Sequence, residues 1–137
     1  MRILGIDYGD ARVGIAVSDL LGFMAQGVRT IKNRGTEKLL TELKEILDEY
    51  KPEKIVIGLP KNMDGSEGFA AQRTYNFCEL LKTLNIKLSL VDERLSSVEA
   101  QKILLANGKH AKDIKDKVDM QAAAIILETY IRSKNAG

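Results

Sequence analysis

Two short apolar runs separated by a polar turn open the chain. The runs Ile3–Ile6 and Val13–Val17 are rich in β-branched residues and too short for typical helices, so they predict a β-hairpin within the first nineteen residues. A third strand is predicted over Met24–Ile31, where β-branched residues gather towards the end of the segment. The front of the chain should therefore form an antiparallel part of a sheet.

Beyond these strands, segments with helical spacing alternate with short apolar runs. This alternation predicts parallel strands joined by right-handed crossovers. The expected elements are a helix over Glu37–Tyr50 with Thr36 as its N-cap, a buried strand over Lys54–Gly58, a helix from Gly65 or Ser66 to about Leu84 closed by Asn85, a strand over Lys87–Asp92, a helix from Ser96 to about Asn107, and a last helix over about Val118–Arg132. Together they predict an α/β fold with a five-stranded mixed sheet and helices on both faces.

A basic segment, residues 108–117, separates the last two predicted helices. Its lysines have almost no apolar residue among them, and Gly108 can end the preceding helix, so a mobile loop is expected. The lysines are candidates for contacts with nucleic-acid phosphates, although a solvated loop without function is the alternative. These candidates are Lys109, Lys112, Lys115 and Lys117.

Composition narrows the class of protein. With 137 residues, of which 45% are hydrophobic and 29% charged, the chain predicts a single globular domain, residues 1–137. A net charge of +2 is too small to indicate a partner by itself. Cys78 is the only cysteine, which excludes an internal disulfide and a cysteine-built zinc site. Asp7 interrupts the N-terminal apolar run too early for a signal peptide, and no stretch is apolar enough to span a bilayer, so a cytoplasmic location without membrane partners is expected.

Acidic residues at the ends of predicted elements are the main candidates for chemistry. Asp7 ends the first strand, Glu93 follows the last strand, and Asp119 begins the last helix. The small residues Ala122 and Ala123 would let that helix lie close to the sheet and bring Asp119 towards Asp7. Carboxylate oxygens are the ligands that Mg²⁺ prefers, so a magnesium or manganese site is a hypothesis.

Each acid also has a purely structural interpretation. Asp7 could hydrogen-bond the turn, Asp119 could be a favourable charge at a helix N-terminus, and Glu93 could pair with a neighbouring arginine. Two further candidates lie in the opening hairpin. Gly9 would clear the approach to Asp7, and Arg12 could clamp a phosphate or instead pair with Asp10 or Asp19.

Four motifs, spread over nearly the whole chain in the same order, resemble those of the YqgF (RuvX) family. They are Gly5–Asp19, Ile57–Gly65, Asp92–Ser96 and Lys117–Ala123. The resemblance implies an RNase H-like fold and membership of the Holliday-junction-resolvase-like superfamily. Members are described as resolvases or as nucleases that mature the 5′ end of the 16S ribosomal RNA precursor. By this match Asp7, Glu93 and Asp119 would be the catalytic acids.

One position departs from the wider superfamily, whose better-characterised resolvases carry an acid at the end of the fourth strand. Here that place reads Gly58-Leu59-Pro60, so Glu93, or Asp64 in the following loop, would have to replace the acid. A metal-dependent endonuclease acting on structured RNA or branched DNA is the first hypothesis.

Two other functions stay open. One is a nucleic-acid-binding factor in ribosome assembly without catalysis. The other is an actin-like phosphotransferase, because Asp7-x-Gly9 also resembles that group's phosphate loop, although that group needs two such domains. The sequence leaves open RNA or DNA, and monomer or homodimer. A resolvase that cuts two strands symmetrically usually needs a dimer.

Overall fold

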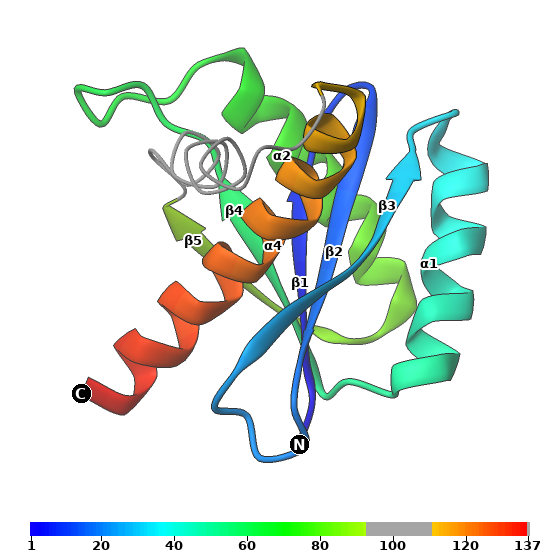
Figure 1. Cartoon of the computed structure of the whole chain (residues 1–137). Coiled ribbons are helices and arrows are strands. Elements are labelled where there is room, and N and C mark those ends of the chain that lie inside the picture. The colour runs from blue at the N-terminus through cyan, green and yellow to red at the C-terminus, as the bar shows by residue number, and fades with distance from the viewer. Residues whose placement is uncertain (93–110, 137) are drawn as a thin grey trace.

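The computed structural model describes the backbone of residues 1–92 and 111–136, and the side chains of residues 1–92 and 117–134. Five strands form one mixed sheet in the order β3-β2-β1-β4-β5 (Figure 1). The first three strands are antiparallel, and β4 and β5 run parallel to β1, as the alternation of elements predicts. The strands are β1 Ile3–Tyr8, β2 Arg12–Ser18, β3 Ala25–Lys32, β4 Lys54–Leu59 and β5 Lys87–Asp92.

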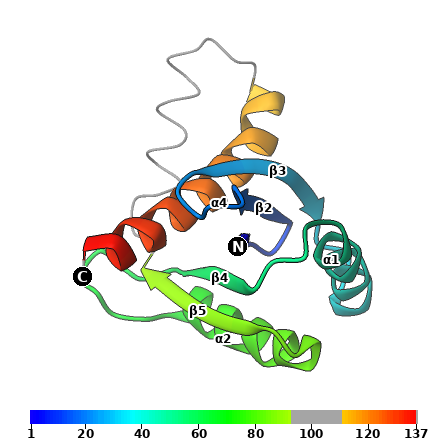
Figure 2. The ribbon, with the colours of Figure 1, turned by 90° about the horizontal axis from the view of Figure 1, so that it is seen from below.

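Helices cover both faces of this sheet, which confirms the predicted layers. The helices α1, Thr36–Tyr50, and α2, Phe69–Leu81, pack on one face, and α4, Ala111–Ala136, crosses the other (Figure 2). Since side chains alternate along a strand, β1 gives Leu4 and Ile6 to the core under α1 and α2, and Ile3 to the core under α4. No helix in the described part of the chain is long and apolar enough to cross a membrane.

Three glycines on neighbouring strands let α4 lie directly on the sheet. A Cβ atom added to Gly14 of β2 would lie 1.9 Å from the backbone oxygen of Asp119. At Gly5 of β1 it would lie 2.9 Å from the backbone oxygen of Ala123, and at Gly27 of β3 it would lie 2.8 Å from the Met120 side chain. The close packing of α4 on the sheet therefore depends both on the small residues of α4 and on the glycines of the strands.

The starts of two helices differ from the sequence-based expectation. Thr36 is the first helical residue and Gly35 is the N-cap, because the carbonyl of Gly35 accepts the first helical hydrogen bond from Leu39. The helix expected from Gly65 or Ser66 begins at Phe69. Its start is displaced because Ser66 donates through both its N–H and its hydroxyl to the Asp64 carboxylate, in a tight turn that is incompatible with a helix.

The C-terminal part brings a larger correction. Residues 111–117, expected to belong to a mobile loop, lie in α4, which also extends beyond Arg132 to Ala136. Alanine and lysine are good helix formers, and a helix already packed on the sheet propagates through them at little cost. The helix expected from Ser96 to Asn107 and residues 108–110 lie outside the described residues. By contrast, the 3₁₀ turn η1, Lys82–Leu84, does end at a left-handed Asn85 as predicted.

Candidate active site

The first candidate acid, Asp7, lies near the end of β1 and belongs to the α4 face of the sheet. Ile3 faces the core under α4, so alternation places Gly5 and Asp7 on the same face. In the antiparallel register Asp7 stands opposite Gly14 of β2. The side chain is half-buried, and its position is fixed by a strand that has neighbours on both sides.

The second candidate acid, Asp119, is brought to the same place by α4. Its backbone lies directly over Gly14, which is the strand partner of Asp7. Directly paired residues of antiparallel strands have Cα atoms roughly 4.5–5.5 Å apart, so Asp119 packs over the immediate strand neighbour of Asp7. The close packing of α4 on the sheet at Asp119 is as expected, and the convergence of the two carboxylates on one site stays a prediction.

Arg12 completes the described part of the site. Its Nε donates to Oδ2 of Asp119 at 2.6 Å, in an ion pair between residues 107 positions apart in the chain. The Arg12 side chain is 36% exposed and that of Asp119 is 17% exposed. A short, charge-assisted hydrogen bond of this kind fixes the direction of the carboxylate as well as compensating its charge.

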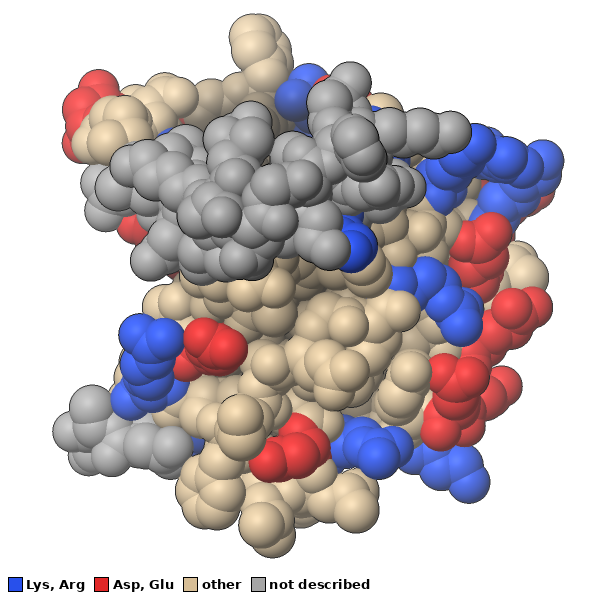
Figure 3. All heavy atoms as spheres, viewed as in Figure 1, with Lys and Arg blue, Asp and Glu red and all other residues tan. Residues whose placement is uncertain are grey.

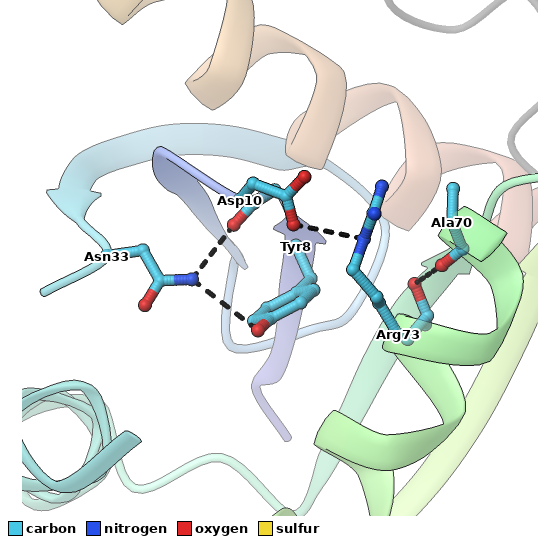
Figure 4. Close-up of polar contacts among 7 residues, drawn as sticks. Tyr8, Asp10, Asn33, Ala70 and Arg73 are labelled. Carbon is cyan, nitrogen blue, oxygen red and sulfur yellow. Dashed lines mark hydrogen bonds and ion pairs between the residues drawn. The ribbon is translucent and has the colours of Figure 1, made fainter. Parts of the chain in front are cut away.

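The structure excludes the alternative partners considered for Arg12. Asp10 instead pairs with Arg73 of α2 at 3.0 Å (Figure 4). Asp19 accepts the backbone N–H of Phe23, a hydrogen bond that lowers the pKa of the Asp19 carboxyl. The helix-terminus interpretation of Asp119 is also wrong, because this residue lies well inside α4.

The turn between β1 and β2 is held by a residue from outside the hairpin, Asn33. Asn33 follows β3, and its side-chain amide donates to the carbonyl of Gly9 at 3.0 Å and to the Tyr8 hydroxyl at 3.5 Å (Figure 4). Tyr8 in turn stacks on Phe77 of α2, with ring centroids 4.2 Å apart. The space beside Gly9 is filled by the backbone of Arg12, since a Cβ atom at Gly9 would lie 2.7 Å from the carbonyl oxygen of Arg12.

The remaining candidate acids are not brought to the site by the described residues. Glu93 lies outside them, although it follows β5, whose carboxyl end lies at the same edge of the sheet as that of the parallel strand β1. Asp64 is exposed, and its carboxylate accepts from Ser66 within its own loop. Within the described chain there is no group of three or more acidic, histidine or cysteine side chains arranged to hold a metal ion.

A basic neighbour of Arg12 was missed by the sequence reasoning. Lys32 ends β3 and is the cross-strand partner of Arg12, so both side chains belong to the same face of the sheet. Exposed lysine and arginine side chains gather over the end of β3 and the start of α1 (Figure 3). Counting residues outward from the β2–β3 turn would not have shown this pairing, because the register shifts by one residue between Ile15 and Ala16.

The predicted phosphate-contacting lysines are only partly described. Lys117 is half-buried on α4 and borders a surface hollow beside Gly27. Lys112 and Lys115 are helical positions whose side chains are not described, and Lys109 lies outside the described residues. Among the residues with described side chains, Arg12 contacts Asp119 directly, and Lys32 is its cross-strand partner.

The strand order and the helices on both faces define a known class of fold. The solved structure of Thermus thermophilus RuvC in complex with a Holliday junction substrate is similar, with a TM-score of 0.57, 13% identity, and coverage of 98% of this chain and 96% of that chain. The fold is accordingly RNase H-like, as the sequence motifs implied.

The sequence comparisons give the family. The family model described as RuvX, Holliday junction resolvase, matches residues 1–133, and the chain belongs to this family of nucleases. A relative from Halothermothrix orenii, named "Putative pre-16S rRNA nuclease", is 44% identical over 136 residues, which are 98% of this chain and 97% of the relative. A relative of the same name from Clostridioides difficile is 47% identical over 134 residues, covering 97% and 95%.

Proposed function

We propose that this chain is a single-domain, divalent-metal-dependent endonuclease that hydrolyses phosphodiester bonds in the 16S ribosomal RNA precursor. The observation that carries the proposal is the packing of Asp119 over Gly14, the strand partner of Asp7, with Arg12 paired to Asp119. Two carboxylates brought together by a strand and a helix remote in sequence, next to a guanidinium, suit the binding of a cation and a phosphate together.

The donor set fits a hard divalent cation such as Mg²⁺ or Mn²⁺. Asp7 and Asp119 offer carboxylate oxygens, and Glu93 is proposed as the third ligand because it follows the parallel strand β5 at the same edge. When such an ion is bound, the chemistry it supplies is activation of water and stabilisation of charge on the reacting phosphate. The role of the protein's own residues is to hold the carboxylates rigidly. Strand β1 does this for Asp7, and helix α4 does it for Asp119.

Recognition of the substrate is assigned to basic residues around these acids. Arg12 and Lys32 lie side by side across β2 and β3, where successive phosphates of one strand could be contacted. Lys109, Lys112, Lys115 and Lys117 are proposed to extend this contact along the nucleic-acid backbone. Ribosomal RNA is preferred as substrate because of the names of the relatives at 44% and 47% identity, with a Holliday junction as the alternative.

A second function is favoured by two observations. The end of β4 and the residues after it, Gly58-Leu59-Pro60, provide no carboxylate, and Asp119 is already paired with a cation of the protein itself. A site weakened in this way suits a factor that binds nucleic acid during ribosome assembly without cleaving it. The two functions differ in whether the acids are needed for an effect on the RNA.

The test is a cleavage assay with purified protein, Mg²⁺ or Mn²⁺, and two substrates, a 16S precursor fragment and a four-way DNA junction. The nuclease proposal expects cleavage of the RNA that stops when the metal is chelated. It also expects no cleavage by Asp7→Asn, because an amide is a poorer and uncharged ligand. Arg73→Gln is the matched control, since it alters an exposed ion pair outside the acids. RNA binding without cleavage by the unmodified protein would favour the assembly factor, and cleavage of the junction alone by a dimer would favour a resolvase.

A further inference from the structure

Arg12 occupies the carboxylate that the proposed metal site needs. Its Nε lies 2.6 Å from Oδ2 of Asp119, and this oxygen is one of the two that Asp119 can offer to a metal ion. The pair is not incidental to the fold. Asp119 is placed by the contact of α4 with Gly14, and Arg12 lies two positions before Gly14 on the same face of β2.

The charges explain why this position matters. Asp119 packs over Gly14, the strand partner of Asp7, and neighbouring carboxylates repel each other unless a cation lies between or beside them. The guanidinium of Arg12 supplies such a positive charge beside Asp119. A divalent ion that binds the same acids meets this charge at short range, and two cations a few ångströms apart disfavour each other even in a water-like dielectric.

We propose that Arg12 is a built-in counter-cation that competes with the divalent ion for Asp119 and so sets the affinity of the site for metal. This inference rests on the proposed metal site. It makes Arg12 a positioning residue, which acts through Asp119, and it gives the guanidinium two alternative anionic partners. These are the carboxylate in the ion-free protein and a substrate phosphate once an ion holds the carboxylate.

The test is a direct binding titration of Mn²⁺ to the full chain without nucleic acid, followed by electron paramagnetic resonance of the free ion. Arg12→Gln removes the positive charge and should tighten Mn²⁺ binding roughly tenfold or more, as expected for loss of one unit charge near a divalent ion. Arg12→Lys keeps the charge and should stay near the affinity of the unmodified protein. Arg73→Gln makes the same change of charge in the exposed pair with Asp10, and should change the affinity by no more than about twofold because solvent and salt screen it.

A double-mutant cycle shows whether the effect passes through Asp119. In the Asp119→Asn background, Arg12→Gln should tighten binding clearly less than in the unmodified protein, because the carboxylate for which the cations compete is absent and only the direct repulsion between guanidinium and ion remains. Circular dichroism on each variant establishes that it is folded.

Unchanged or weaker Mn²⁺ binding by Arg12→Gln would overturn the inference and make Arg12 a support of the metal site. Absence of Mn²⁺ binding from the unmodified protein and Arg12→Gln alike would overturn the metal site itself. Binding gained only in Arg12→Gln would support the inference.

Discussion

Replacement of Gly14 by alanine should test both the fold and the site, because this glycine is the point where α4 comes closest to the sheet. The added Cβ would lie 1.9 Å from the backbone oxygen and 2.3 Å from the carbonyl carbon of Asp119. Real Cβ atoms essentially never come closer than 3.0 Å to another heavy atom, so the helix must retreat by at least about 1 Å. A backbone oxygen cannot rotate out of the way as a flexible side chain can.

The cost follows from what such a retreat disturbs. The core under α4 includes Ala123, Ile126 and Leu127, all fully or almost fully buried, and every one of them loses contact if the helix lifts. Overpacking by one methyl group typically costs 1–3 kcal/mol, and rigid backbone on both sides places Gly14→Ala at the upper end, about 3 kcal/mol. For a chain of this length the midpoint of thermal unfolding should fall on the order of 10 °C.

Thermal and urea unfolding followed by circular dichroism measure this loss. Gly68→Ala is the matched control, because the atom nearest to its added Cβ, Nδ2 of Asn62, lies 3.8 Å away and its backbone is extended. The control should change the free energy of unfolding by no more than about 1 kcal/mol. A midpoint of thermal unfolding for Gly14→Ala within about 2 °C of that of the unmodified protein would contradict the prediction. It would mean that α4 does not lie as close to β2 as the placement of Asp119 requires.

Two other predictions concern titrating side chains away from the acids. Cys78 is only 8% exposed and burial raises the pKa of its thiol, so it should react slowly with a disulfide reagent at pH 8 in the folded protein and fully in urea. The Cys78 thiol ionises at a lower pH in the unfolded protein than in the folded protein, so the free energy of unfolding should fall as the pH rises above about 8.5. A Cys78→Ala variant whose free energy of unfolding depended on pH in the same way would contradict this prediction. The hydrogen bond that Lys54 donates to the Tyr130 hydroxyl at 2.8 Å lowers the pKa of that phenol, so Lys54→Met should raise it in an ultraviolet titration. An unchanged titration curve would show that the pair does not persist in solution.

Local pattern was enough to predict the sheet. The runs Ile3–Ile6 and Val13–Val17 predict a hairpin because they are apolar, short and rich in β-branched residues. The same apolar run makes Asp7 conspicuous, as a charged residue at the end of a strand whose preceding residues are buried. Strand directions followed from the hairpin and from the alternation of strands and helices, whereas the strand order β3-β2-β1-β4-β5 was first given by the structure.

Local pattern failed where a tertiary contact decides the outcome. Residues 111–117 contain few apolar positions, yet they continue a helix that is stabilised by packing of later residues on the sheet. The partner of Arg12 could not be predicted because Asp119 is 107 positions away, whereas Asp10 and Asp19 are near in sequence and chemically equivalent. Asn33 presents the same difficulty, since its bond to Gly9 spans 24 positions and exists only once β3 is paired with β2.

The most direct test of the proposed metal site is an X-ray experiment on crystals of this protein soaked in Mn²⁺, with data recorded for anomalous scattering. The account predicts a peak within coordination distance of carboxylate oxygens from both Asp7 and Asp119, and its loss in crystals of Asp7→Asn. A fully soaked crystal with no peak beside these two carboxylates, and with the Arg12–Asp119 pair unchanged, would contradict a metal-dependent nuclease site here.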